Sequence, residues 1–463
     1  MNVPKSRETA VMPVADDLLE LARRVASAAR EHEEIEAYVS RVCETDVKVH
    51  DKAVESLVVA ERAGVGVRVV VDGRQGFAWA GSLEPSIIDE TLAAARDNVG
   101  FATPDECNGL ATPEEATGPV ATLDLWRDDV TATDSTAKVE LALAAEATTR
   151  AADPRLRAVE SVTYGDAAVE AAIATSTGVE ATTRRTSCSV AAFALAGEGS
   201  ETRTGYGFSA GRAVADLDVE EAARDAAERA VRLLGARQPR STRLPVVLDP
   251  LVTRSFVAII GAALSGEAIV KGRSMFVGRA GEEIASPVVT LTDDPTDPES
   301  FGAATHDAEG VPTRRVPLVV EGVLRSFLHN VYTGRRAGTG TTGSAVRGGY
   351  ASTPSAGARA LSLTPGTMSP DELLRAAGTA VYVQSVSGLH SGTNPVSGDF
   401  SVGAEGLMVR DGALAEPVRE LTIASTLPRM LRDVVAVGSD REWLPGGAAG
   451  MTLLIDGMTI SGA

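Results

Sequence analysis

Hydrophobic and polar positions follow two different periods along the first part of the chain. Over residues 16–31 the apolar side chains recur on one helical face, which predicts an amphipathic helix. Valines then alternate with other residues over 65–71, and the turn DGRQG leads back into an apolar segment that contains Phe77. This alternation predicts a β-hairpin.

The remaining pattern of the first half alternates helices with strand-rich segments. A loop rich in Pro, Thr and acidic residues is expected over 102–120, and several short strands with polar turns such as STG (176–178) are expected over 156–208. Further helices are predicted at 86–98, 135–150 and 218–236.

The second half is dominated by short strand patterns and Gly-rich turns. The stretch FVAIIGAALSGEA (256–268) predicts a helix of small and apolar side chains, and brief helices are expected at 370–377 and 428–435. Hairpin turns are predicted at VEGV (320–323), RDGA (410–413) and IDGM (455–458).

The segment RQPRSTRLP (237–245) is the clearest boundary in the chain. We therefore predict an α+β protein of two domains. Residues 15–238 form a mixed sheet with helices, and residues 239–463 form a β-rich domain with a few helices.

Composition narrows the classes of function. The formal net charge is −19, which argues against a nucleic-acid surface because phosphate binding depends on Lys and Arg. Three widely spaced cysteines form neither a disulfide framework nor a zinc cluster, which favours a reducing compartment. The start of the chain reads as a polar tail without a signal-peptide core, and no apolar run is long enough to span a bilayer. We therefore expect a soluble, cytoplasmic protein.

The sequence does not support a dinucleotide-binding, helical metal-binding or serine-nucleophile motif. GTGTTG (338–343) fits G-x-G-x-x-G, but no helix pattern follows it, so a surface loop is the better interpretation than a dinucleotide site. No two histidines lie at the i, i+4 spacing of a helical metal site, and no serine sits in a G-x-S-x-G elbow.

Two Gly- and Ser-rich segments, 326–349 and 384–406, carry the most promising polar side chains. Glycine permits close backbone approach, and the side chains could hold a peptide or a carboxylate. These segments read equally well as a binding groove or as ordered structural loops. The candidate pocket residues are His329, Tyr332, Arg335, His390 and Asp399.

Several longer segments, in order and across both halves, resemble the TldD/PmbA family of peptidases. They include ERAGVGVRVVVDGRQGFAWA in the first half. In the second half they include AIVKGRSMFVGRAGEEIASP, THDAEGVPTRRVPLVVEGVLRSFLHNVYTGRRAGT and SGDFSVGAEGLMVRDGALAEPVRELTIAS. The resemblance implies a two-domain fold, a mostly β C-terminal domain that encloses the site, and proteolysis of small or unfolded peptides.

The family contains a metal-bearing TldD-type subunit and a TldE-type (PmbA-type) partner. TldD-type chains carry H-E-x-x-x-H on a helix, with two zinc-binding histidines, a general-base glutamate and a further Cys ligand near the C-terminus. The resemblance puts these motif positions at Val257, Ala258 and Ala262, and GGAAGMTLL offers no Cys. It therefore implies a TldE-like chain with no catalytic residue, no metal and no cofactor of its own.

The resemblance further implies a heterodimer with a TldD-type subunit that carries the zinc. We expect the chain to be inactive alone and to form a homodimer, if at all, when that partner is absent. Two alternatives stay open: a stand-alone family member whose pocket performs metal-independent chemistry, and a homodimeric peptide-binding protein.

Overall fold

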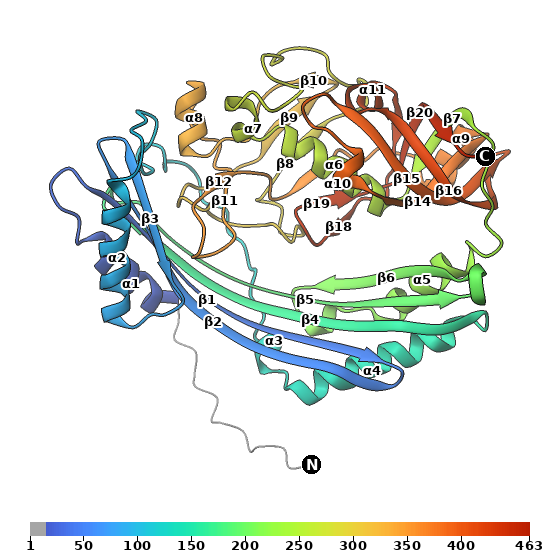
Figure 1. Ribbon diagram of the computed structural model, residues 1–463, viewed down its shortest axis with the longest axis horizontal. Helices are drawn as coiled ribbons and strands as arrows, with labels where there is room; N and C mark the ends of the chain where they lie inside the picture. Colours follow the sequence, from blue (N-terminus) through green and yellow to red (C-terminus); the bar gives the residue numbers. More distant parts are fainter. Residues whose placement is uncertain (1–14) are drawn as a thin grey trace.

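The computed structural model describes residues 15–463, so most of the polar tail expected at the start of the chain lies outside them. A long antiparallel sheet forms one layer of the molecule, and residues 242–463, here called the C-terminal half, lie over one of its faces (Figure 1). The α+β class is confirmed.

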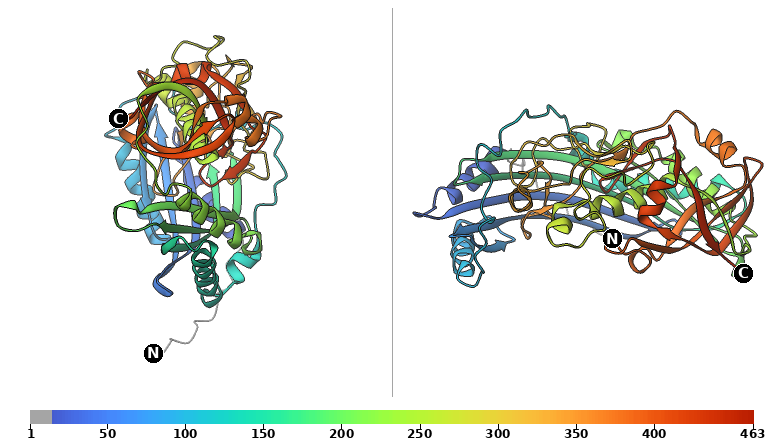
Figure 2. Two further views of the ribbon diagram at one scale, coloured as in Figure 1. Left: turned by 90° about the vertical axis from the view of Figure 1, so that its right-hand side faces the viewer. Right: turned by 90° about the horizontal axis from the view of Figure 1, so that it is seen from above.

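The long sheet has the strand order β3-β2-β1-β4-β5-β6. The view from above in Figure 2 shows these strands running along much of the molecule. Their bounds are β1 (Glu34–His50), β2 (Ala53–Val71), β3 (Arg74–Ala80), β4 (Leu156–Thr175), β5 (Glu180–Ala196) and β6 (Arg203–Gly211). The hairpin predicted around the 65–71 valines is confirmed as the pairing of β2 with β3.

The two faces of this sheet differ because side chains alternate along each strand. On β1, Ile35, Val39 and Val47 are fully or almost fully buried beneath helices. The even-numbered side chains of β1, from Glu36 to Asp46, lie on the face toward the C-terminal half. The helices on the opposite face are α1 (Ala15–Ala26), α2 (Pro85–Val99), α4 (Ser135–Ala152) and α5 (Val219–Val231).

Three expectations for this half are wrong, and one of them is the helix expected over 218–236, which ends at Val231. The segment 156–208 forms three strands, two of them 20 and 17 residues long, instead of several short ones. β4 and β5 are long because each is hydrogen-bonded to a neighbouring strand on both edges. Polar and small residues within them therefore do not end the strand. The first helix ends at Ala26 instead of residue 31.

The C-terminal half contains a closed five-stranded barrel. Strands β16, β15, β14, β7 and β20 pair in sequence, and β16 also pairs with β20 to close the ring. In the left view of Figure 2 the barrel is seen nearly down its axis, so its strands form a ring. The strand bounds are β7 (Thr242–Leu248), β14 (Ala380–Ser387), β15 (Asp399–Arg410), β16 (Ala413–Thr426) and β20 (Leu453–Ser461), with β17 (Val434–Val437) added on β20.

A second sheet, in the order β10-β9-β8-β13-β19-β18, lies beside the barrel. Its strands are β8 (Leu291–Asp293), β9 (Val316–Val320), β10 (Val323–Leu324), β13 (Leu361–Leu363), β18 (Glu442–Leu444) and β19 (Ala448–Gly450). Helix α6 (Pro250–Ala263) shares one hydrophobic core with this sheet and with the barrel.

The helix predicted over 256–268 is two helices. After α6, Leu264 and Ser265 break the chain direction, and α7 (Gly266–Val270) begins with the Ser265 side chain accepting a hydrogen bond from the Ala268 amide. The Gly266 amide donates to the Leu328 carbonyl, 2.6 Å away, so a contact distant in sequence fixes this break.

The turn predictions in the C-terminal half are confirmed at 320–323 and 410–413, which join β9 to β10 and β15 to β16. IDGM is wrong as a hairpin: it lies inside β20, where the register with β7 shifts between Ile455 and Met458. The remaining helices and strands are α3 (Asp128–Ala132), α8 (Val331–Ala337), α9 (Pro370–Ala377), α10 (Leu389–Gly392), α11 (Leu427–Arg432), β11 (Ala345–Val346) and β12 (Ser355–Ala356). No helix within residues 15–463 is long and apolar enough to cross a membrane.

Candidate functional site

Helix α6 presents a stripe of small side chains away from the core. Ala258 and Ala262 are exposed and lie four residues apart, one turn after Arg254, so these three positions share one side of the helix. Val257 is only 2% exposed and packs into the core of the C-terminal half. Of the three positions expected to match the zinc motif, two therefore face outward and one faces inward.

A hollow of about 660 Å³ lies between the long sheet and the C-terminal half. Its floor is built from neighbouring strands whose small side chains leave room above the sheet. Pairing places Gly165 of β4 opposite Ser189 of β5, and Ala167 opposite Ser187. Ala210 of β6 continues this row beside Ser189. The floor is therefore a shallow trough lined by small side chains.

Charged side chains border the trough on two sides. Glu44 and Asp46 of β1 lie at one edge, next to Ala167 and Gly165. Arg185 and Arg212 also line the hollow, and Arg212 Nη2 donates to the Ser300 carbonyl at 2.5 Å. Burial, together with nearby Arg185, lowers the pKa of Arg212 below its ordinary value. The hollow is thus lined by both acidic and basic side chains.

The roof of the hollow joins it to α6. Gly446 and Gly447, in the turn between β18 and β19, line the hollow together with Arg359. A Cβ added at Gly446 would overlap the guanidinium of Arg254, so this turn lies directly against the α6 stripe. Arg254, at the start of the stripe, therefore contacts the turn that lines the hollow.

Aromatic side chains continue the floor along β5 and β6. The rings of Phe193 and Tyr206 lie 4.8 Å apart, and those of Tyr206 and Phe208 lie 5.6 Å apart. Tyr206 is close enough to Arg254 for that positive charge to act on its pKa, although burial dominates and raises it. The sheet surface near α6 is thus apolar, whereas the trough near β1 is polar.

The residues at the expected zinc positions do not fit a metal. Val, Ala and Ala offer no lone pair to a cation. The segment where the further ligand is expected does pack on α6: a Cβ at Gly450 would lie 2.5 Å from the Pro250 carbonyl oxygen. Among residues 15–463, no three His, Cys, Asp or Glu side chains gather so as to hold a metal ion. The two segments are adjacent, but neither supplies a ligand.

Two of the predicted pocket residues bind the loop that follows α2. Tyr332 Oη donates to Asp105 Oδ2 at 3.0 Å. Arg335 forms a two-point ion pair with Glu115, with distances of 2.9 and 2.7 Å, and also donates to the Leu110 carbonyl. These side chains therefore hold residues 105–115 against α8.

The other three lie apart from them. His329 is buried, its Nδ1 lies 3.2 Å from Thr333 Oγ1, and burial lowers its pKa. His390 is exposed on α10, and Asp399 at the start of β15 accepts a hydrogen bond from Ser397 Oγ at 2.6 Å. Within residues 15–463, no hydrogen bond or ion pair joins any two of the five predicted pocket residues.

Buried charges fix the C-terminal half on the sheet. Glu36 of β1 pairs with Arg347, and also with Arg68 of β2 at 2.5 Å. Arg68 lies 3.5 Å from Glu309, which accepts the Val331 amide at the start of α8. The two arginines hold the pKa of Glu36 below its ordinary value despite its burial. Such pairs, once one partner is lost, leave a costly buried charge.

The trough, the aromatic cluster and this charge network were missed in the sequence. The available signal was the alternation of small and buried residues in β4 and β5, as in Gly165, Ala167 and Ala168. That signal identifies a face but not the segments above it, because the roof includes Arg359, Gly446 and Gly447, which lie far along the chain from β4 and β5.

Family models for the PmbA/TldA metallopeptidases match three consecutive segments. Domain 1 matches residues 35–99, the central domain matches 128–234, and the C-terminal domain matches 241–462. The chain is 27% identical to the metalloprotease PmbA of Escherichia coli O157:H7, over 99% of this chain and 98% of that protein. It is 30% identical to a metalloprotease of Methanothermobacter thermautotrophicus, over 89% of this chain and 88% of that protein.

Solved structures share the fold. A candidate modulator of a DNA gyrase from Thermotoga maritima matches with a TM-score of 0.87 and 25% identity, covering 96% of this chain and 99% of that chain. TldE from Thermococcus kodakarensis matches with a TM-score of 0.86, covering 97% of this chain and 100% of that one, and its 22% identity shows the fold alone. The chain belongs to the PmbA/TldD metallopeptidase family.

Proposed function

We propose that this chain is the non-metal subunit of a TldD/TldE-type metallopeptidase that acts on unfolded peptides. Its partner is a TldD-type subunit, and the partner's zinc supplies the activated water. This chain completes the chamber and holds the peptide, and it is inactive alone. We further propose that the complex works in the cytoplasm.

The observation that carries this proposal is the exposed side of α6, whose Arg254 contacts the turn that lines the hollow. It presents Ala258 and Ala262, beside Arg254, where a metal-bearing relative needs ligands and a base. The β18–β19 turn nevertheless packs on this helix. A chamber wall without its metal ligands suits a subunit that binds substrate and leaves the hydrolysis to a partner.

The trough supports an extended peptide as the substrate. Small side chains at Gly165, Ala167, Ser187 and Ser189 admit a backbone close to the sheet, and the flanking charges suit a chain with free termini. A hollow of about 660 Å³ is too small to hold a folded domain. The geometry therefore favours unfolded segments.

The test compares the chain alone with the chain mixed with a TldD-type subunit, using an unfolded peptide substrate. We expect no chelator-sensitive cleavage by the isolated chain and cleavage by the mixture. Robust chelator-sensitive cleavage by the isolated chain would contradict the proposal. Metal-independent cleavage would favour the stand-alone alternative, and co-purification as a homodimer that binds peptide without a TldD-type subunit would favour the binding protein.

A variant tests the trough within the complex. Ser187→Trp places a large ring on the floor, so the KM for peptide should rise by about tenfold or more with the complex still assembled. Thr182→Trp is the matched control, since Thr182 is exposed on the opposite face of the same strand. Equal kinetics for the two variants would place the peptide elsewhere.

A further inference from the structure

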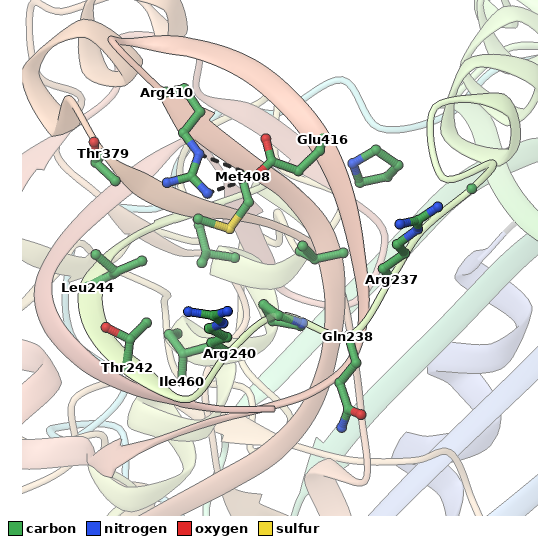
Figure 3. Close-up of a pocket in the computed structure, with 15 residues that line it drawn as sticks. Arg237, Gln238, Arg240, Thr242, Leu244, Thr379, Met408, Arg410, Glu416 and Ile460 are labelled. Carbon is green, nitrogen blue, oxygen red and sulfur yellow. Dashed lines mark hydrogen bonds and ion pairs between the residues drawn. The ribbon is translucent and has the colours of Figure 1, made fainter. Parts of the chain in front are cut away.

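The barrel of the C-terminal half is open at one end. A pocket of about 590 Å³ occupies this end (Figure 3). It shares no lining residue with the hollow above the long sheet. Each of the five barrel strands contributes at least one apolar side chain to its lining. These include Leu244 from β7, Val381 from β14, Met408 from β15, Val418 from β16 and Ile460 from β20.

The barrel side chains that line the pocket form an apolar surface. Val381, Met408, Val418 and Ile460 are at most 5% exposed, so these lining side chains are packed into the barrel and form an apolar base for the pocket. A pocket of this size lies within the range of small-ligand sites, which often occur at barrel mouths. The base can therefore receive a compact apolar group.

The rim is rich in arginine. Arg237 and Arg240 come from the segment that leads into β7, and Arg410 comes from the end of β15. Arg410 is neutralised by Glu416 through two hydrogen bonds of 3.2 and 2.7 Å. The guanidinium groups of Arg237 and Arg240 make no hydrogen bond or ion pair within residues 15–463. Figure 3 shows Arg240 within the ring of strands, the Arg410–Glu416 pair across from it, and Arg237 at the right-hand edge of the ring.

The rim segment is held in place by the barrel. The Arg237 amide donates to the Pro417 carbonyl at 3.2 Å, and the Arg419 amide donates back to the Arg237 carbonyl at 3.1 Å. Gln238 Nε2 donates to the Glu420 carbonyl at 3.0 Å. The arginines are therefore presented on an ordered backbone, which lowers the entropic cost of binding.

The local charge is unusual for this chain. The whole chain has a formal net charge of −19, yet the rim combines three arginines with one glutamate. Guanidinium groups suit carboxylates because their donors match both oxygens. An apolar base below two unpaired arginines selects a ligand with an apolar body and a carboxylate at one end.

We propose that the open end of the barrel is a binding site for an organic carboxylate with a compact apolar body, held by Arg237 and Arg240 above Leu244, Met408 and Ile460. Two sources have this chemistry: a free aliphatic acid, and the C-terminus of a peptide that ends in an apolar residue. The site is separate from the hollow beside α6 and does not depend on the proposed peptidase role.

The experiment is calorimetric titration of the full chain. One arm uses octanoate, with octanamide and octylamine as neutral and cationic controls of the same length. The other arm uses N-acetyl-leucyl-leucine with a free carboxylate, with its C-terminal amide as the control. We expect one molecule of carboxylate per chain and at least about tenfold weaker binding of each control, because a hydrogen bond to a charged group is lost.

The variant R237Q/R240Q should weaken carboxylate binding by at least about tenfold and make the remaining affinity less dependent on salt. Both side chains are exposed, so the fold should be retained. R243Q is the matched control: Arg243 is an exposed neighbour that lines a different surface hollow, with Asp433 and Asp456. Leu244→Glu should also abolish binding, by placing a like charge in the base.

The two arms identify the source. Tighter binding of octanoate assigns a free acid, and tighter binding of the dipeptide assigns a peptide C-terminus; either result supports the site. The proposal is overturned if neither carboxylate binds, if the amides bind as well as the acids, or if R237Q/R240Q binds like R243Q.

Discussion

Arg254 of α6 lies against Gly446, which has no side chain to separate the guanidinium from the turn between β18 and β19. This contact joins the helix that carries Ala258 and Ala262, two of the positions expected to match the zinc motif, to a turn that lines the hollow above the sheet. It also depends on a backbone with φ +106° at Gly446, a conformation that other residues rarely adopt.

The first prediction concerns this contact. Gly446→Ala adds both backbone strain and an overlap with Arg254, so we expect the free energy of unfolding to fall by about 1–3 kcal/mol. Urea titration measures the change. Gly199→Ala is the control, because Gly199 also has a positive φ, of 55°, but nothing lies within 4 Å of an added Cβ. An equal loss in both variants would show that the Arg254 contact is unimportant.

The second prediction concerns pH. Burial raises the pKa of Asp293 to about 6, and Asp293 Oδ1 accepts the Arg359 and Ala360 amides while Oδ2 has no partner. The folded protein thus retains a proton that the unfolded chain, with an ordinary pKa of about 3.9, has released. The stability contributed by this proton is fully present below about pH 4 and is lost as pH rises through about 6.

Asp293→Asn keeps the acceptor at Oδ1 and cannot ionise. Between about pH 5 and about pH 7.5, the wild-type protein should therefore lose about 1 kcal/mol more unfolding free energy than Asp293→Asn. Parallel urea titrations at both pH values test this. A difference between the proteins that does not change with pH, or that changes in the opposite direction, would refute the assignment.

Some of this architecture could be predicted from the sequence, and the reasons are local. The β2–β3 hairpin follows from alternating valines and a turn at Asp72 and Gly73, both with positive φ. Helix α4 follows from its own apolar spacing and from Asp134, whose side chain accepts the Ala137 amide. In both cases the pattern and its physical cause lie within about 20 residues.

The misses have non-local causes. The break between α6 and α7 depends on Leu328, more than 60 positions from Ser265. Tyr332 and Arg335 were expected in a pocket because of their residue type, but their partners are Asp105 and Glu115 in a loop of the first half. Residue type identifies a capacity for binding, and the topology decides which partner uses it.

The third prediction concerns the loop that these residues hold. Arg335→Ala removes both bonds to Glu115 and the bond to Leu110, so residues 102–127 should be released locally. We expect limited proteolysis in this loop to quicken by about fivefold, which corresponds to about 1 kcal/mol for a partly exposed pair. Arg429→Ala, which removes an exposed pair with Asp433 on α11, should leave cleavage of the loop unchanged. Equal protection in wild-type protein and Arg335→Ala would contradict this role.

The most direct test of the central proposal is the zinc content and chelator-sensitive peptidase activity of the purified chain, measured before and after a TldD-type subunit is added. We predict no stoichiometric zinc and no cleavage for the chain alone, and one zinc per heterodimer with chelator-sensitive cleavage after addition. One zinc per isolated chain, with cleavage that a chelator abolishes, would contradict the account.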